Sequence, residues 1–476
     1  MDQNTRTDHD FSATAERGDL PLLPKERLWG FAEFTFANSA LAIATWAFLI
    51  GGAVGLFVGV KEGIAAIVIG NIFGVVLTSL ATTVMAGRYG TEQFIGLRSQ
   101  FGWNGTRLVY VLAVIVLTMG WLAVLAMMFG RSIDGLTALA SGAEANPIGL
   151  KATIASIGAI LLTWFIVAKG PTSIKVFNMI VSPALVILML VMLWLILRAH
   201  SWADLLAMPA LDPPFDDHKL NLIIAIEVNM AAGFSWWPYI GNLARLTKGE
   251  RTAFWPNIFG IFGAAALGEI VGLLAAVALG NSDPTIWMTT IAGVGVGVIA
   301  LAFIAFANVT SMANILYTSV VGLRQVGTDG IRNIGWGTLL FGFCIIPLAL
   351  VTFYPQMYDG FFIFLVWTSA LNSALAGIGI ADYFFLRRQR LDLRALHGAQ
   401  PGGSFQFIGG FNPIGLVALA AGFAVYVWLF NPQTLESHWA FAYLTASIPS
   451  CLLAGVLHLG LTRVFARSRT WGDYPR

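Results

Sequence analysis

Long apolar stretches recur along most of the chain, separated by short polar segments. A helix needs about 20 apolar residues to cross the hydrocarbon core of a bilayer, and the stretches reach this length repeatedly. Of the 476 residues, 57% are hydrophobic and only 11% are charged, whereas soluble domains carry about 25% charged residues. The bilayer is therefore the solvent of this chain.

The apolar runs and the turn residues between them predict about 12 transmembrane helices in one all-α domain. The predicted spans are 28–52, 63–87, 105–130, 150–169, 171–199, 219–243, 254–280, 287–323, 334–354, 358–386, 411–430 and 439–465. The membrane domain is expected to cover residues 27–465. Residues 1–26, expected to be disordered, and residues 466–476 are predicted to be tails.

Lys and Arg residues in the loops predict the orientation. With the N-terminus in the cytoplasm, about 22 of the 27 basic residues fall on the cytoplasmic side, as the positive-inside rule requires. Both termini are therefore expected in the cytoplasm, in a multi-pass protein of the cell (inner) membrane. The net charge of +2 is too small to indicate a nucleic-acid partner.

Two of the predicted helices have features that interrupt a regular span. The first contains Gly51 and Gly52, and the sixth contains Gly233 and Pro238, whose proline lacks the N–H needed for the helical ladder. A break frees backbone polar groups that lipid cannot satisfy. Breaks in the first and sixth helices indicate two inverted repeats of five helices. The alternative is an ordinary proline kink with glycines that allow close packing.

The repeats are predicted at about 27–199 and 219–386, with two peripheral helices at 411–465. On the eighth helix, Ala307, Thr310, Ser311 and Asn314 share one face at helical spacing. Adjacent hydroxyls near the free carbonyls of a broken helix can bind Na⁺, a hard cation. Alternatively, the hydroxyls bond back to the preceding turn, but an amide in hydrocarbon still needs a partner.

Two tryptophans lie at depths where this residue is uncommon. Trp121 lies near the middle of the third helix and Trp236 at the interruption of the sixth, whereas membrane tryptophans gather at the interfaces. Two indoles offer large flat faces that could hold a planar heteroaromatic ring between them. The alternative is that Trp121 fills a gap between helices.

Carboxylates inside the membrane are functional candidates because burying their charge is costly. Glu269 lies near the middle of the seventh helix and is predicted as a proton carrier or, alternatively, as a partner to a buried donor. Glu227 lies closer to the end of the sixth helix, where a solvated role is an equal alternative. The sequence contains no H-E-x-x-H metal motif and no G-x-S-x-G nucleophile motif. No enzymatic activity is therefore expected.

These features resemble the nucleobase:cation symporter-1 family, also known as the purine and cytosine permeases. Residues 235–245 read S-W-W-P-Y-I-G-N-L-A-R and are similar to the family pattern S-W-x-P-Y-x-x-D-Y-x-R, with Asn242 in place of the acid. Further similarity lies in Ile69-Gly70-Asn71, Gly120-Trp121, Thr310-Ser311 with Asn314, and Ala381-Asp382-Tyr383 leading to Arg387-Arg388.

The resemblance implies a leucine-transporter-type fold and assigns a site. Its substrate-binding residues would be Trp121, Trp236, Asn314, Phe48, Ser235 and Leu125. Its Na⁺ ligands would be the carbonyls of Ala44, Ala47 and Ala307 and the hydroxyls of Thr310 and Ser311. Some relatives have glutamines where this chain has Phe48 and Leu125, which disfavours a substrate that needs those amides, such as a hydantoin.

The sequence thus predicts a secondary active transporter that imports a nucleobase or a related planar nitrogen heterocycle by alternating access. No cofactor is expected, and the coupling ion is Na⁺ or H⁺. The alternatives are an amino-acid transporter of the same fold, a channel, and a receptor without flux. A channel is disfavoured because the polar residues cluster at one depth on few helices.

Overall fold

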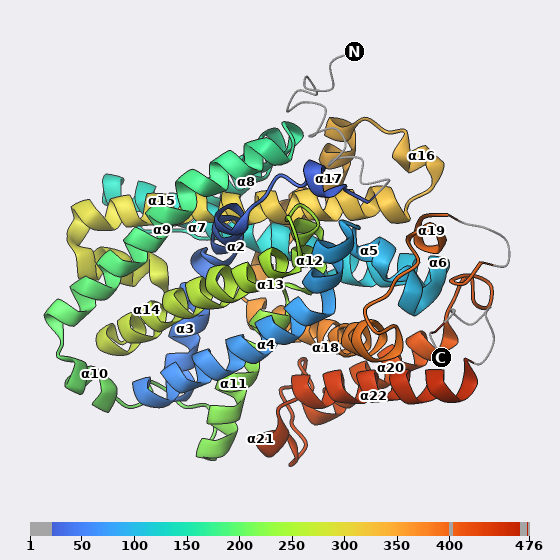
Figure 1. The fold of residues 1–476 in the computed structure, drawn as a ribbon. Coiled ribbons are helices and arrows are strands. Elements are labelled where there is room, and N and C mark those ends of the chain that lie inside the picture. The colour runs from blue at the N-terminus through green and yellow to red at the C-terminus, as the bar shows by residue number, and fades with distance from the viewer. Residues whose placement is uncertain (1–20, 399–402, 467–473, 475–476) are drawn as a thin grey trace.

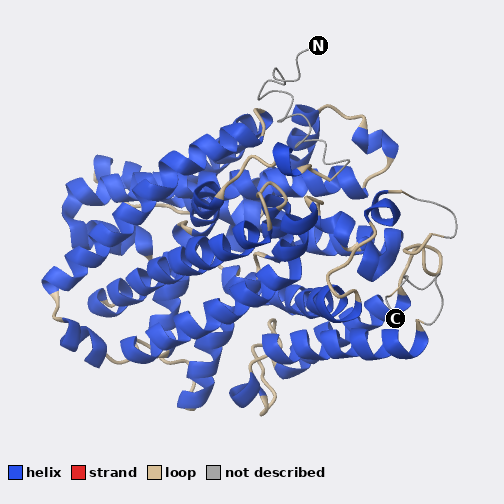
Figure 2. Cartoon of the chain, in the orientation of Figure 1, coloured by secondary structure: helices blue, strands red, loops and turns tan. Residues whose placement is uncertain are grey.

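The computed structural model describes residues 21–398, 403–466 and 474. Helices make up most of the described chain, and three isolated bridges are its only strand-like pairings (Figure 2). The elements of the first half are η1 Pro24–Glu26, α2 Phe31–Ala42, α3 Thr45–Phe57, α4 Val60–Tyr89, α5 Gln93–Gly96, α6 Arg98–Tyr110, η2 Val111–Thr118, α7 Met119–Ser141, α8 Leu150–Ala168, α9 Pro171–Ala199 and α10 Trp202–Ala207.

The second half begins with the sixth predicted span. Its elements are α11 His218–Phe234, α12 Trp237–Ala244, α13 Glu250–Asn257, η3 Ile258–Phe262, α14 Gly263–Leu279, α15 Pro284–Val326, α16 Asp329–Arg332, α17 Trp336–Phe353, η4 Pro355–Tyr358, α18 Phe361–Ile380, η5 Ala381–Leu386, α19 Leu393–His397, α20 Pro413–Leu429, α21 Phe441–Leu444 and α22 Ser447–Phe465.

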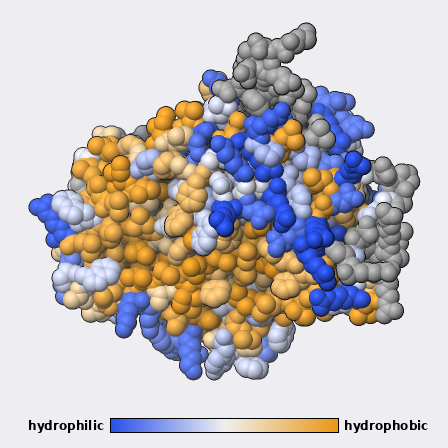
Figure 3. Space-filling view, in the orientation of Figure 1, coloured by the Kyte–Doolittle hydropathy of each residue, from blue (hydrophilic) through white to orange (hydrophobic). Residues whose placement is uncertain are grey.

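Ten helices of the described chain are long and apolar enough to cross a membrane, and the bent pair α2 and α3 makes eleven. The eleventh predicted segment, 411–430, corresponds to α20, which is apolar but has only 17 residues. A broad hydrophobic band crosses the surface, and hydrophilic residues gather at the lower left and the upper right of the view (Figure 3). These features confirm an all-helical, multi-pass membrane protein.

The first span is broken, as the sequence predicted. Helices α2 and α3 meet at an angle of 57°, with Ile43 and Ala44 in extended conformations between them. The sixth span is interrupted only at Ser235 and Trp236, which keep right-handed helical dihedrals between α11 and α12. The interruption before Pro238 therefore bends the sixth span less sharply than the break bends the first span.

Spans of one predicted repeat pack against spans of the other. The first span packs through α3 on α14 of the seventh, while the second span, α4, packs on α11 of the sixth. The third span likewise packs through α7 on α15 of the eighth. Gly74 and Gly233 allow α4 and α11 to approach closely, because a Cβ on either glycine would overlap the other's backbone. This exchange of equivalent helices is the arrangement expected for inverted repeats.

The last two spans lie outside this core, with α18, α20 and α22 side by side (Figure 1). Helix α22 begins at Ser447, later than the predicted start at residue 439, because Phe430 bridges Ser437 and the chain turns through α21. Of the predicted N-terminal tail, residues 1–20 lie outside the described chain. Residues 21–26 contain the turn η1, and Leu22 is buried.

Candidate functional site

Three tryptophans from three spans meet at the centre of the molecule. Trp46 comes from the first turn of α3, Trp121 from α7, and Trp236 from the interruption between α11 and α12. The Trp46 ring lies 6.3 Å from the Trp121 ring and 5.3 Å from the Trp236 ring, measured between centroids. Trp46 therefore contacts both of the indoles that the sequence predicted to enclose a planar ring.

Further aromatic residues surround this cluster. Phe361 and Phe364 of α18 contact the Trp121 ring edge to face, at 5.6 and 5.7 Å. Tyr239 of α12 contacts the Trp236 ring at 6.5 Å, and its hydroxyl donates to Thr118 Oγ1 over 3.1 Å. The site is thus walled by aromatic rings from four of the spans.

The three indole N–H groups of the cluster are buried without a hydrogen-bond partner in the described structure. Trp46, Trp121 and Trp236 are each at most 3% exposed. Buried donors are nearly always satisfied, and an indole N–H can only donate. The cluster is therefore chemically suited to a flat ligand that carries acceptor atoms on its edge.

The predicted site residue Asn314 has a reciprocal partner. Its amide nitrogen donates to Asn178 Oδ1 over 3.2 Å, and the Asn178 amide nitrogen donates to Asn314 Oδ1 over 3.1 Å. Asn314 also donates to the Thr310 carbonyl. The pair joins α9 to α15, so an amide edge would become available to a ligand only if the pair opened or used its remaining lone pairs.

The other predicted substrate residues are buried in ordinary packing. Phe48 contacts Trp287 edge to face at 5.8 Å, and Leu125 is fully buried in α7. The Ser235 hydroxyl donates to the Ala232 carbonyl over 2.6 Å, within its own helix. These contacts leave the proposed substrate roles of the three residues as predictions.

The two predicted cation-binding hydroxyls lie against the end of α2. Thr310 Oγ1 donates to the Ala40 carbonyl over 3.1 Å and to the Ala307 carbonyl over 2.7 Å. Ser311 Oγ donates to the Leu41 carbonyl over 2.9 Å. Two hydroxyls and three carbonyl oxygens thus gather beside the break, and all are hard oxygen ligands of the kind that Na⁺ prefers.

The carbonyls at this place come one turn earlier than the predicted Ala44 and Ala47. Helix α2 ends at Ala42, and the last carbonyls of a helix have no partner within it. Ala44 instead accepts from the Ala47 N–H at the start of α3. The break is thus closer to the N-terminus than the sequence indicated, and the available carbonyls move with it.

Asn308 secures the other side of the break, and the sequence analysis did not identify it. Its side chain accepts from the Thr45 N–H over 3.3 Å and donates to Thr45 Oγ1 over 2.9 Å. Asn308 precedes Thr310 by two residues on α15. One helix therefore holds both ends of the broken first span, and a single polar residue offered no signal of that long-range contact.

The predicted proton carrier Glu269 lies in a buried polar cluster between α4, α11 and α14. Asn71 donates both to Glu269 Oε2 and to Asn229 Oδ1, the latter over 3.1 Å. Glu269 Oε1 has no partner in the described structure. The other intramembrane carboxylate differs, because Glu227 accepts from four donors: the Tyr426 hydroxyl, the Ser447 hydroxyl and the N–H groups of Ala446 and Ser447.

The remaining sequence motifs make buried polar contacts away from the three tryptophan side chains' ring contacts. Asn242 accepts from the Gln93 N–H over 2.8 Å and donates to the Thr318 carbonyl over 3.2 Å, which an ionised acid could not do. Asp382 forms a buried ion pair with Arg387 at 2.8 Å. Asn242 thus joins α12 to α5 and α15, whereas the Asp382–Arg387 pair lies within one segment at η5.

Comparison with known proteins agrees with this architecture. The chain is 22% identical to the purine-uracil permease NCS1 of Arabidopsis thaliana, covering 87% of this chain and 71% of that protein. It is 25% identical to the hydantoin permease of Microbacterium maritypicum, covering 81% of this chain and 78% of that protein.

Solved transporter structures share the fold. The closed conformation of Mhp1, a nucleobase-cation-symport-1 family transporter with bromovinylhydantoin bound, matches with a TM-score of 0.77 at 20% identity, covering 94% and 95% of the two chains. A Na⁺-coupled sialic acid symporter matches with a TM-score of 0.59 at 10% identity, covering 96% and 94%. The predicted leucine-transporter-type fold is confirmed.

The family model described as permease for cytosine/purines, uracil, thiamine and allantoin matches residues 21–448. This match covers most of the chain and confirms the resemblance seen in its motifs. The protein is thus a transporter and not an enzyme, and it belongs to the nucleobase:cation symporter-1 family of purine and cytosine permeases.

Proposed function

We propose that the protein imports a nucleobase or a related planar nitrogen heterocycle by cation symport with alternating access. The observation that carries the proposal is the cluster of Trp46, Trp121 and Trp236, with its three buried and unpartnered N–H groups. Flat aromatic walls favour a flat ligand, and the N–H groups favour ring nitrogens and carbonyl oxygens. The substrates named for the two permease relatives have both features.

The same site argues against an amino-acid substrate. An amino-acid transporter of this fold needs a place for a carboxylate and another for an ammonium group, usually on the backbone of broken helices. Here the Ala40 and Leu41 carbonyls at the end of α2 face the Thr310 and Ser311 hydroxyls, the groups proposed below to bind the cation. The cluster itself offers indole faces and donors and no charged side chain.

Coupling to a cation is supported by the oxygens beside the break. Thr310, Ser311 and the carbonyls of Ala40, Leu41 and Ala307 would hold Na⁺ between α2 and α15. Proton coupling through Glu269 is the competing proposal, supported by its unpartnered Oε1. Bound Na⁺ would fix the break and with it Trp46, which follows the break by two residues.

The test is uptake into liposomes containing the purified protein, with purines, pyrimidines and hydantoins as competitors. An imposed inward gradient of Na⁺ or of H⁺ should drive accumulation of at least one of these heterocycles above its outside concentration. Saturable uptake with a fixed ion-to-substrate ratio separates a symporter from a channel. Equal uptake with and without both gradients would contradict cation symport, and accumulation of amino acids alone would contradict the substrate class.

A further inference from the structure

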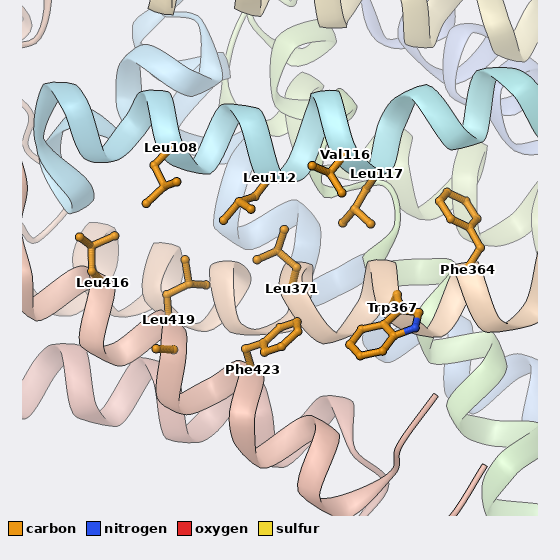
Figure 4. Close-up of a pocket in the computed structure, with 11 residues that line it drawn as sticks. Leu108, Leu112, Val116, Leu117, Phe364, Trp367, Leu371, Leu416, Leu419 and Phe423 are labelled. Atoms are coloured by element: carbon orange, nitrogen blue, oxygen red, sulfur yellow. The ribbon is translucent and has the colours of Figure 1, made fainter. Parts of the chain in front are cut away.

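An apolar groove of about 700 Å³ lies between the third, tenth and eleventh spans (Figure 4). All the residues that line it are Leu, Val, Ala, Phe or Trp. Leu108, Leu112 and Val116 form one wall, and Leu416 and Phe423 of α20 lie on the opposite wall. Leu108 and Val116 are 42% and 60% exposed, so the groove is open to whatever surrounds the helices.

The length of the groove corresponds to one leaflet. From Leu108 to Leu117 the helix rises by roughly 14 Å at about 1.5 Å per residue, which is close to half of the roughly 30 Å hydrocarbon core. At the far end, Trp367 of α18 stacks on Phe423 with ring centroids 6.0 Å apart and an interplanar angle of 22°. In η2 the hydrogen bonds run i→i+5, so Val116 and Leu117 both line the groove one turn after Leu112.

A positive charge lies at the other end of the groove. Asn104 precedes Leu108 by one turn on the same helix face, and Arg107 Nη1 donates to Asn104 Oδ1 over 3.0 Å. Arg107 Nε also donates to the Val326 carbonyl over 2.9 Å, which fixes an exposed guanidinium there. Nearby, Arg98 stacks on Trp103 at 3.7 Å, and tryptophan is typical of the membrane interface.

We propose that this groove is a binding site for an anionic phospholipid of the leaflet nearest Arg107. One acyl chain lies in the groove from Leu108 to Trp367, and the phosphate lies against Arg107. The apolar lining suits the acyl chain, and the length of the groove suits an acyl chain that extends through one leaflet. The guanidinium of Arg107 complements the negative charge of the headgroup. The acyl chain of a zwitterionic lipid also fits the groove, but its headgroup is attracted less strongly to Arg107.

Occupation of the groove also has a consequence for transport, and this step rests on the proposed function. Phe364 lines the groove and contacts Trp121 at 5.7 Å. An acyl chain in the groove therefore packs behind the ring that supports Trp121. We expect bound phospholipid to raise substrate affinity, whereas lipid binding itself needs no substrate.

Native mass spectrometry of the purified protein with added phosphatidylglycerol or phosphatidylcholine tests the site directly. Ala420 lines the groove, whereas Val417 on the same helix is 54% exposed and does not line it. Ala420→Trp should fill the groove and lower the binding of both lipids, and Val417→Trp is the matched control. Wild-type protein should prefer phosphatidylglycerol by about 5-fold, on the scale of one basic residue at a membrane surface.

Arg107→Gln should lower phosphatidylglycerol binding to the level of phosphatidylcholine, while Arg107→Lys keeps the preference. Arg390→Gln removes another exposed charge and should change the binding of neither phosphatidylglycerol nor phosphatidylcholine. Equal lipid binding by the Ala420→Trp and Val417→Trp variants would overturn the site, and an undiminished preference in Arg107→Gln would overturn its anionic headgroup. A dimer dissociated by Ala420→Trp but not by Val417→Trp would show that a second copy covers the groove. Failure of substrate uptake leaves these binding results unaffected.

Discussion

At the scale of single residues, the site brings three buried indole N–H groups together at one place. Core aromatic residues need only faces, and phenylalanine would provide them without leaving a donor unsatisfied. Trp46, Trp121 and Trp236 instead bury three donors at one place. The free-energy cost of burying three unsatisfied donors is offset when a ligand with acceptor atoms binds to the cluster.

Phenylalanine substitutions at the cluster should therefore weaken substrate binding while keeping the ring faces. We expect Trp46→Phe, Trp121→Phe and Trp236→Phe each to lower affinity by about 2–12-fold, the effect of one neutral hydrogen bond. Alanine at Trp121 or Trp236 should cost more, about 5–150-fold, because a stacking face is lost as well. Calorimetric titration of the purified variants measures both series.

Trp29 provides the matched control for these substitutions. Its indole N–H is also buried and unpartnered in the described structure, but its ring packs on Phe34. Trp29→Phe should leave substrate affinity unchanged. If the cluster variants behaved like Trp29→Phe, the N–H groups would have no part in binding.

The amide pair of Asn314 and Asn178 allows a second prediction. If Asn314 reads the edge of the substrate, Asn314→Leu should lower affinity by different factors for purines and pyrimidines, because the lost hydrogen bonds differ between their edges. Asn178→Leu should change all affinities by one common factor, since it only supports Asn314. A competition assay with a panel of bases distinguishes the two patterns.

One common factor for both variants would instead make the pair a structural link between α9 and α15. The sequence singled out Asn314 because an amide in hydrocarbon needs a partner. It could not identify that partner, which lies 136 positions earlier in the chain. Single residues with unusual chemistry were predictable, whereas their long-range neighbours were not.

At the scale of elements, the broken first span shows why a break can be predicted without its position. The glycines at 51 and 52 suggested an irregular helix, but they lie within α3. Gly51 instead permits close packing on α14, because a Cβ there would overlap the Glu269 carbonyl oxygen. The break lies at Ile43 and Ala44, where Asn308, Thr310 and Ser311 of a distant helix satisfy the freed groups.

The attachment of the peripheral helices leads to an element-scale prediction. Glu227 accepts two backbone N–H groups at the start of α22 and the hydroxyls of Ser447 and Tyr426. A carboxylate at a helix N-terminus is favourable, and hydrogen bonds to charged groups contribute about 1.5–3 kcal/mol. Glu227→Gln should therefore lower the thermal unfolding temperature by several degrees, with little change in substrate affinity.

Glu269→Gln is the informative comparison, because Glu269 receives a side-chain hydrogen bond only from Asn71 in the described structure. It should cost less stability than Glu227→Gln in the same thermal unfolding assay. Equal losses in the two variants, or a large loss of substrate affinity in Glu227→Gln, would contradict the structural role of Glu227.

At the scale of the whole molecule, the apolar pattern was sufficient to predict the transmembrane segments, whereas the leucine-transporter-type fold was implied by the family resemblance. Each of the twelve predicted segments corresponds to a helix or a broken helix, because lipid forces every backbone group to be satisfied within its span. The π-helical stretches η2, η3 and η5 were not predicted. They depend on packing between spans, and an apolar run reads the same with either hydrogen-bond spacing.

The coupling of substrate to cation is a property of the whole molecule and gives the last prediction. Na⁺ between Thr310, Ser311 and the carbonyls of α2 would hold the break in place, and with it Trp46. Substrate and Na⁺ should then increase each other's affinity by the same factor, typically about 5–150-fold, as linkage requires. Changing Thr310 and Ser311 together to alanine should abolish that factor and preserve most of the Na⁺-free affinity, because the tryptophans are untouched.

The measurement is substrate affinity against Na⁺ concentration at fixed pH, and against pH at fixed Na⁺, in the wild type, the double variant and Glu269→Gln. Under Na⁺ coupling, Glu269→Gln retains the Na⁺ effect that the double variant loses. Under proton coupling, the protonated carboxyl favours the substrate-bound state, so affinity falls as pH rises and is indifferent to Na⁺. Glu269→Gln, which resembles the protonated carboxyl, would then bind substrate equally at every pH, and the coupling role would move from the oxygens beside the break to the cluster around Asn71.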